Sequence, residues 1–325
     1  MERTNPVPVM VPNGAPPRTE AGRKHVLVLA SQTHSLLNFR GPMMRAMLAN
    51  GHRVSACAPD PDREIIRALE EMGVRFRLLK LQRTGQNPLQ DARSLLAMRD
   101  LIARLHPDQV LSYTIKPVIY GSLGARLAGV RERYAMISGL GYAFGEAGVR
   151  RRALNRAVVE LYRASLRGSR AVFFQNPDDL ALFLDAGVVN ERQAVLINGS
   201  GVDLTRYRPA PLEGSRPVFL LIARLIAEKG VLDYVEAARL VKRRYPHAVF
   251  RLAGWFDNNP AAIPRELVES WHAEGLIEFL GLLDDVRPAL AACTTYVLPS
   301  YYREGVPRTI LEAMATGLPT CTTDS

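Results

Sequence analysis

Two glutamates flank an expected helix start near the end of the chain, within YVLPSYYREGVPRTILEAMATGLPT (296–320). A strand pattern ends at the first proline of this segment. Gly305 and Val306 then precede a second proline, which suits a first helical turn. The amides of Gly305 and Val306, together with the helix dipole, would bind an anion. Glu304 stands just ahead of this anion site. Glu312 follows about two turns into the helix, where a carboxylate can accept hydrogen bonds from a vicinal diol such as ribose. The alternatives are a helix-terminus charge for Glu304 and a surface charge for Glu312.

Two cations stand close together in the segment LLIARLIAEKG (220–230). Arg224 ends an expected strand, and Lys229 precedes a glycine and the next expected helix. Cations at a strand tip suit a diphosphate, because guanidinium grips phosphate oxygens in a bidentate manner. Two solvated surface charges are the alternative interpretation.

A glycine-rich segment, SGLGYAFGEAG (138–148), also follows an expected strand. Gly139, Gly141 and Gly145 are spaced as GxGxxxG, which differs from the dinucleotide fingerprint GxGxxG. The acidic residue that should follow the next strand is also missing from its place. An NAD-dependent oxidoreductase is therefore the less favoured alternative for the enzyme class.

The remaining candidate ligands show no metal-site pattern. The pairs Asp178–Asp179 and Asp284–Asp285 fall at expected helix starts, where Asp caps a helix and favours its dipole. The histidines and cysteines lack zinc-ligand spacing, and three cysteines are too few for a disulfide framework. These are Cys57, Cys293 and Cys321. We therefore expect that the protein uses neither a metal nor a cofactor. We also expect it to function in a reducing compartment.

Strands alternate with helices along the first two hundred residues. The expected strands are 25–31, 52–59, 75–81, 109–114, 133–138, 171–175 and 194–198. Helical patterns lie between them, at 36–50, 62–72, 90–105, 117–129, 150–167 and 177–186. This alternation predicts a parallel sheet with right-handed crossovers.

A stretch rich in Gly and Pro, 199–217, interrupts the alternation and indicates a linker. The pattern then restarts, with strands at 218–224, 248–254, 277–281, 295–300 and 319–324 and helices at 230–245, 264–273, 285–292 and 306–316. We therefore expect an α/β chain of two Rossmann-like, doubly wound domains, 24–198 and 218–325. Ligands in such sheets lie beyond the carboxyl ends of the strands, so the two domains would face each other across a ligand cleft.

The composition indicates a folded chain without a spanning helix. Of 325 residues, 47% are hydrophobic and 23% charged, which is typical of globular proteins. No apolar run reaches the length of a membrane span. Residues 1–23 are rich in proline and lack the apolar core of a signal peptide, so a disordered tail is expected.

Positive charge is concentrated in the first two thirds of the chain. The net charge is +10 overall, with +12 up to residue 212 and −2 from 213 onward. The densest segment, 148–170, holds seven arginines and one glutamate. An amphipathic helix with a basic face is expected there. It would be either a solvated surface or a contact with an anionic membrane. Nucleic acid is disfavoured, because no recognisable nucleic-acid-binding module is present.

The motifs resemble those of family 4 retaining glycosyltransferases of the GT-B fold. The similarity lies in ARLIAEKG (223–230), the Glu-x7-Glu block EGVPRTILE (304–312) and the linker phrase INGSGVDLTRYRP (197–209). SLLNFRGP (35–42) and ISGLGYAF (137–144) resemble the subgroup that builds polysaccharides or lipid-linked oligosaccharides. The most similar transferases add N-acetylgalactosamine to undecaprenyl-diphosphate sugars.

The resemblance assigns roles to individual residues. Arg224 and Lys229 would hold the donor diphosphate and stabilise its departure. Glu304 would contact the donor sugar, with Gly305 and Val306 near the sugar and phosphates, and Glu312 would hold the ribose hydroxyls. The catalytic set would be Glu304, Arg224 and Lys229, without a metal.

On the acceptor side, many relatives carry a histidine near the tip of the fourth strand, where this chain has Lys116. A catalytic base is therefore not assigned, and His34 and Lys116 are the candidates on this side. The acceptor-binding domain would be 24–198, and the nucleotide-sugar-binding domain would be 218–325.

The resemblance implies a retaining transferase that moves a sugar, a HexNAc, from a UDP-sugar to a lipid-linked sugar in cell-surface polysaccharide or glycan synthesis. Its partners would be the UDP-sugar, an undecaprenyl-diphosphate-linked acceptor and an anionic membrane surface. The enzyme would be located in the cytoplasm, as a peripheral protein on the inner face of the plasma membrane. Because the chain ends on an expected strand while relatives continue, we expect a truncated second domain, and an inactive nucleotide-binding remnant stays an alternative.

Overall fold

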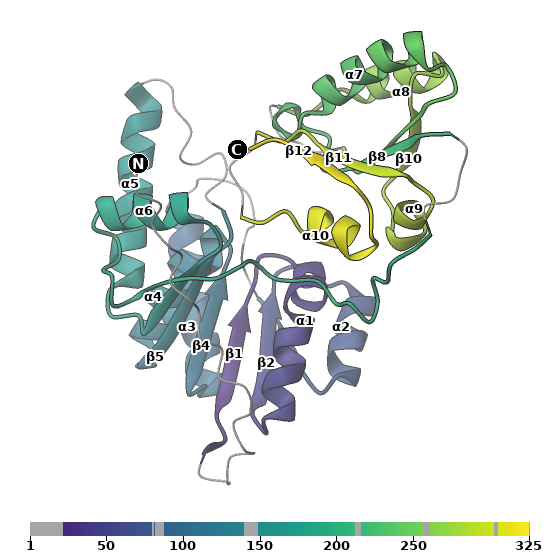
Figure 1. Ribbon diagram of the computed structural model, residues 1–325. Coiled ribbons are helices and arrows are strands. Elements are labelled where there is room, and N and C mark those ends of the chain that lie inside the picture. Colours follow the sequence, from purple (N-terminus) through teal and green to yellow (C-terminus); the bar gives the residue numbers. More distant parts are fainter. Residues whose placement is uncertain are drawn as a thin grey trace, which may run out of the picture. The chain divides into compact units, whose positions relative to one another are not determined.

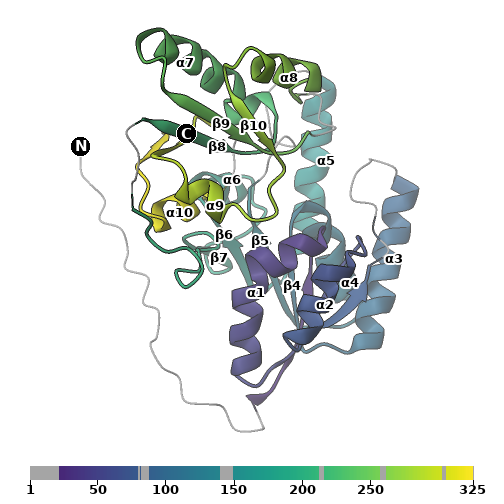
Figure 2. The same cartoon turned by 90° about the vertical axis from the view of Figure 1, so that its right-hand side faces the viewer.

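The computed structural model describes residues 22–79, 81, 88–139, 149–211, 216–256, 261–301 and 305–324 (Figures 1 and 2). It contains two parallel sheets with helices between the strands. The chain divides into two compact units: residues up to Ala135 with Gly168–Arg170 form one, and Met136–Arg167 with Ala171 onward form the other. The predicted boundaries 24–198, 199–217 and 218–325 stay a prediction.

The first sheet has seven strands in the order β3-β2-β1-β4-β5-β6-β7. In chain order these strands are β1 (His25–Leu29), β2 (Arg53–Ala58), β3 (Arg75–Leu78), β4 (Gln109–Tyr113), β5 (Glu132–Ile137), β6 (Ala171–Phe174) and β7 (Ala194–Leu196). The helices between them are α1 (Thr33–Ala49), α2 (Arg63–Glu71), α3 (Pro88–Leu105), α4 (Ser122–Leu127), α5 (Val149–Leu166) and α6 (Pro177–Asp185). The order reverses between β1 and β4, and such a switch point opens a ligand crevice at the carboxyl ends of the strands.

Apolar residues of α3 and α4 pack on β1 and β4 to form a core of the first unit. The strands alternate their side chains between two covered faces, which is why β1 is buried at all five positions. This core cluster contains Leu27, Leu29, Cys57, Leu79, Leu81, Met98, Ile102, Val110, Ala125 and Val130. Burial raises the pKa of the Cys57 thiol to about 12, so this thiol stays protonated at neutral pH.

The second sheet has five strands in the order β10-β9-β8-β11-β12. The strands are β8 (Val218–Ile222), β9 (Val249–Ala253), β10 (Glu278–Gly281), β11 (Thr295–Leu298) and β12 (Thr320–Thr322). The helices are α7 (Val231–Arg244), α8 (Arg265–Ala273), α9 (Arg287–Ala291) and α10 (Arg308–Ala315). Here the order reverses between β8 and β11, so the second crevice lies where these two strands end.

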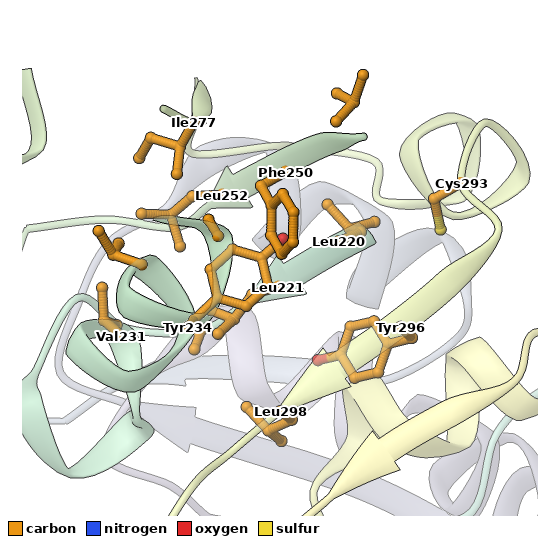
Figure 3. Packing of buried hydrophobic residues seen from close by; sticks show 14 of the residues in the cluster. Leu220, Leu221, Val231, Tyr234, Phe250, Leu252, Ile277, Cys293, Tyr296 and Leu298 are labelled. Atoms are coloured by element: carbon orange, nitrogen blue, oxygen red, sulfur yellow. The ribbon is translucent and has the colours of Figure 1, made fainter. Parts of the chain in front are cut away.

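The core of the second sheet is built around aromatic and branched side chains (Figure 3). Phe250 stacks on Phe219 with 4.6 Å between ring centroids, and Tyr234 meets Phe250 edge-on at 5.4 Å. The Tyr234 hydroxyl donates a hydrogen bond of 2.9 Å to the carbonyl oxygen of Arg251. This bond satisfies a phenol that would otherwise be costly to bury and fixes α7 on β9.

Every expected strand and helix is present, and the differences are at the ends of elements. Prolines explain two of these differences. The helix expected over 117–129 begins as a π-helical turn, Pro117–Gly121, before α4. The helix expected over 306–316 begins only at Arg308, because Pro307 is extended with ψ 120°. Among the helices of the described ranges, none has the length and apolar character that a membrane crossing requires.

Candidate functional site

Arg224 and Lys229 lie just beyond the carboxyl end of β8. Arg224 follows the strand by two residues, and Lys229 ends a short 3-10 turn, Ala227–Lys229. Lys229 is buried, with 7% of its surface exposed. Both cations therefore occupy the crevice edge where the sequence places them.

Gly230 brings the lysine turn against the loop after β11. Its φ is +70°, and a Cβ atom at this position would lie 2.1 Å from the carbonyl oxygen of Pro299. The Tyr301 amide donates to the carbonyl oxygen of Glu228 at 3.0 Å, which fixes the same two loops together. Only glycine permits this approach, so the loops after β8 and β11 form one continuous surface.

Trp255 follows β9 by two residues, as Arg224 follows β8. The pairing of Ile222 with Ala253 continues to Leu225 and Phe256 in the same register, so Arg224 is opposite Trp255. Residues that are opposite in a ladder leave the same face of the sheet. The indole is 45% exposed. An exposed indole therefore occupies the backbone position opposite Arg224.

Glu312 is buried in α10, where two side chains contact its carboxylate. The Tyr207 hydroxyl donates to Oε1 at 2.9 Å, and Arg308 Nε lies 2.9 Å from the same oxygen. Burial raises the pKa of Glu312, while the Tyr207 and Arg308 contacts oppose that rise. Burial, followed by the charge of Glu312, also raises the pKa of Tyr207 to about 12. The interpretation of Glu312 as a surface charge is wrong.

The structure corrects the expected geometry of the Glu-x7-Glu block. Glu304 lies outside the described residues. Gly305 and Val306 precede α10 instead of forming its first turn, and the Gly305 amide lies 3.4 Å from the carbonyl oxygen of Ser138. Glu312 is one turn into the helix instead of two, because the helix starts at Arg308.

The segment predicted as a linker runs along α10. No helix or strand occurs in its described parts, 199–211 and 216–217. The Asp203 carboxylate accepts bonds from the Thr205 amide at 2.9 Å and the Thr205 hydroxyl at 2.6 Å, and this turn presents Tyr207. Further along, the Ala210 amide donates to the carbonyl oxygen of Thr316 at 2.9 Å. Irregular backbone thus supports the helix that carries Glu312.

The two acceptor-side candidates, His34 and Lys116, follow the paired strands β1 and β4. His34 is exposed near the start of α1, with its Nε2 atom 2.7 Å from the Asn38 amide. Lys116 Nζ pairs with the Asp91 carboxylate at 3.0 Å, and both side chains are mostly covered. Lys116 therefore has a structural partner in this structure, whereas His34 faces solvent.

The two acidic pairs lie at the starts of two other helices. Asp178 and Asp179 lie in the first turn of α6, and Asn176 caps that helix by accepting from the Asp179 amide at 2.7 Å. Asp285 precedes α9 and pairs with Arg287. Both pairs lie at helix starts, as the sequence predicted, but the expected capping role is wrong: Asn176 is the N-cap of α6, and Val286, without a side-chain bond, is that of α9. The glycine-rich segment is described only at Ser138 and Gly139.

Two family models cover most of the chain. "Glycosyl transferase 4-like domain" matches residues 41–199, and "Glycosyl transferases group 1" matches residues 216–325. The chain is a glycosyltransferase. It belongs to the family that its motifs predicted, and the oxidoreductase alternative is wrong.

Curated relatives of this glycosyltransferase act in lipid-linked glycan assembly. An N,N'-diacetylbacillosaminyl-diphospho-undecaprenol alpha-1,3-N-acetylgalactosaminyltransferase of Campylobacter jejuni is 26% identical over 296 residues, covering 87% of this chain and 76% of the relative. A UDP-Gal:alpha-D-GlcNAc-diphosphoundecaprenol alpha-1,3-galactosyltransferase of Escherichia coli is 27% identical over 248 residues, covering 71% and 61%.

Solved structures show that this glycosyltransferase has the GT-B fold. Anabaena HepE in complex with UDP-glucose superposes with a TM-score of 0.70 at 19% identity, covering 93% of this chain and 81% of that one. A glycosyltransferase from Rickettsia africae gives a TM-score of 0.69 at 17% identity, covering 93% and 80%.

Sequence reasoning missed three residues at the glycosyltransferase site. Arg308 precedes Glu312 by four positions, and this spacing alone predicts a helical ion pair. Tyr207 is 105 positions from Glu312, and Trp255 adjoins Arg224 only through strand register. No local pattern could have identified these two contacts.

Proposed function

We propose that this glycosyltransferase moves an N-acetylhexosamine from a UDP-sugar to a sugar carried on undecaprenyl diphosphate. The names of the Campylobacter and Escherichia relatives support both the donor and the acceptor kind. The observation that carries the donor half is the contact between the β8 and β11 loops, which holds the turn of Lys229 against Pro299 and Tyr301, ahead of the helix that carries Glu312.

The site favours departure of a nucleoside diphosphate. As the bond between the anomeric carbon and the diphosphate oxygen breaks, negative charge develops on the leaving group. Arg224 and the buried Lys229 stabilise that charge through preorganised electrostatics, without a metal. The acceptor hydroxyl attacks from the face that the diphosphate leaves, so the anomeric configuration is retained. This route needs no protein nucleophile.

The remaining residues of the block bind the donor. Glu312 accepts hydrogen bonds from the ribose hydroxyls. Glu304 contacts the transferred sugar, and Gly305 and Val306 border the sugar and phosphates. Val306 is exposed ahead of α10, as contact with a ligand requires.

The acceptor reaches the enzyme at the inner face of the plasma membrane. Its carrier is a membrane lipid, and the first two thirds of the chain have a net charge of +12. In α5, Arg156 is exposed, whereas Arg163 pairs with Glu160. Basic residues near an anionic leaflet each add roughly 1 kcal/mol of attraction. His34 and Lys116 are the acceptor-side residues of this proposal.

A transfer assay on the full chain tests the proposal. The substrates are UDP-N-acetylgalactosamine or UDP-N-acetylglucosamine and an undecaprenyl-diphosphate-linked HexNAc in anionic vesicles, with and without EDTA. We expect an α-linked product at the same rate under both conditions. A β-linked product would reject retention, loss of activity with EDTA would reject metal independence, and transfer only to water-soluble sugars would reject the lipid-linked acceptor.

Replacing Glu312 by alanine should weaken UDP binding by about 1–3 kcal/mol, the cost of losing a charged hydrogen-bond partner. Calorimetric titration of the full chain measures the change. Met314→Ala is the matched control, because Met314 is on the same helix and exposed. Unchanged UDP affinity in Glu312→Ala would reject the ribose assignment.

Trp255 should report donor binding by fluorescence. It is opposite Arg224 and 45% exposed, whereas Trp271, the second tryptophan of the chain, is only 5% exposed. UDP held by Arg224 should therefore change the emission of Trp255 and leave that of Trp271 constant. In Trp255→Phe we expect the change to disappear while calorimetry still detects binding. A full emission change in that variant would contradict the placement of the diphosphate at Arg224.

A further inference from the structure

We infer that Tyr207 is a positioning residue of the donor site, which holds the Glu312 carboxylate in place for the ribose hydroxyls. This inference rests on the proposed function, because it gives Glu312 the ribose-binding role. Tyr207 belongs to the segment 199–211, outside the motifs that carry the diphosphate and sugar contacts.

The contact between the two side chains is direct and shielded. The Tyr207 hydroxyl is 2.9 Å from Glu312 Oε1, and Tyr207 and Glu312 are 8% and 7% exposed. The rest of the tyrosine packs in the core cluster of the second sheet. A phenol anchored in a core has one position from which to donate, so it selects one orientation of the carboxylate.

The phenol is held from its own segment as well as from the core. The Tyr207 amide donates to the carbonyl oxygen of Asp203 at 3.0 Å, inside the turn that Thr205 closes onto the Asp203 side chain. Beyond it, the Ala210 amide is bonded to the end of α10. The backbone on both sides of Tyr207 is therefore fixed, and little entropy is lost when the hydroxyl meets Glu312.

Three arginines accompany the pair. Arg308 is on α10, Arg206 is adjacent in the turn, and Arg287 at the start of α9 interacts electrostatically with Tyr207. Arg308, Arg206 and the hydroxyl favour the ionised carboxylate, while burial opposes it. Removing the hydroxyl removes one stabilising contact, so the pKa of Glu312 rises further. Protonation then begins at a higher pH.

Tyr207→Phe tests the role with little change in shape. At pH 7.5 we expect UDP to bind about 3- to 10-fold more weakly, the range for one lost hydrogen bond. The loss of affinity on acidification should set in at higher pH than in the wild type. Titration of the UDP phosphate is common to both proteins and cancels in the comparison. If Tyr207 only stabilised the fold, the pH dependence of UDP affinity would be the same in Tyr207→Phe and in the wild type.

Tyr234→Phe is the matched control. It also removes a buried phenol that donates at 2.9 Å, in this case to the carbonyl oxygen of Arg251. Both variants should lose similar stability in denaturant titrations, but only Tyr207→Phe should lose UDP affinity. Equal loss of affinity in both variants would overturn the inference.

A double-mutant cycle separates this inference from the proposed function. If Tyr207 acts through Glu312, Tyr207→Phe should weaken UDP binding no further in a Glu312→Ala background. Weakened binding in Glu312→Ala with an unchanged Tyr207→Phe would overturn the positioning role and leave the ribose assignment intact. Unchanged binding in Glu312→Ala would reject the ribose assignment, and this inference with it.

Discussion

Arg224→Ala should lower the rate of sugar transfer by about 10²–10³-fold, the loss seen when one preorganised donor to a developing charge is removed. Arg224 lies two residues beyond the end of β8, and the proposed function places the charge of the departing diphosphate at Arg224 and the buried Lys229. Because that charge is larger in the transition state than in the bound donor, turnover should fall more than UDP affinity. Initial rates at saturating donor measure the effect.

Two further variants test whether that loss of rate comes from the Arg224 guanidinium group. Arg224→Lys keeps the charge but not the bidentate fork, so an intermediate rate is expected. Arg239→Ala removes an arginine of α7 that pairs with Glu236 and Glu274 at the surface, and it should leave the rate unchanged. A rate in Arg224→Ala within a factor of two of Arg239→Ala would contradict the assignment of Arg224 to the leaving group.

Gly230→Ala should lower the free energy of unfolding by about 3 kcal/mol and abolish measurable UDP binding. A left-handed conformation costs a non-glycine residue roughly 1–2 kcal/mol. The added Cβ would also lie 2.1 Å from the Pro299 carbonyl oxygen, so the loops after β8 and β11 must separate. Separation moves Lys229 away from the donor. Urea denaturation and calorimetry measure the two losses.

Gly275→Ala separates the conformational strain from the clash. Gly275 belongs to the same sheet domain and has a φ of +67°, but a Cβ there would meet no atom within 4 Å. We expect this control to lose about 1–2 kcal/mol of stability and to bind UDP normally. If the two variants behave alike, close approach to Pro299 is not what holds the lysine turn.

The order of strands and helices could be predicted from the sequence because each element repeats a buried pattern of its own. The residues at which helices begin and end were harder to predict. Pro307 suits a first helical turn, yet its extended ψ delays α10 to Arg308, which leaves Glu312 one turn into the helix instead of two. The family resemblance, and not the pattern of elements, assigned Arg224, Lys229 and Glu312 to one donor, and that assignment stays a prediction.

Contacts made across the fold could not be predicted. The hydrogen bond from Tyr207 to Glu312 joins an irregular segment to a helix 105 positions later. The adjacency of Trp255 and Arg224 needs the register of β8 and β9, which one sequence does not specify. The close approach of Gly230 to Pro299 likewise follows from packing. The sequence therefore identified candidate residues by their chemical type and spacing. It did not identify the side chains that orient those candidates.

The hydrogen bonds of Tyr207 and Ala210 to α10 join the connecting segment to the helix that carries Glu312, the proposed ribose-binding residue. Thermodynamic coupling between two places on a protein is reciprocal. A nucleotide that restrains Glu312 therefore also restrains the turn at Asp203–Tyr207, and a strain applied to that turn changes the affinity for the nucleotide. Insertions or deletions in this connection would thus alter donor affinity without touching any residue that contacts the donor.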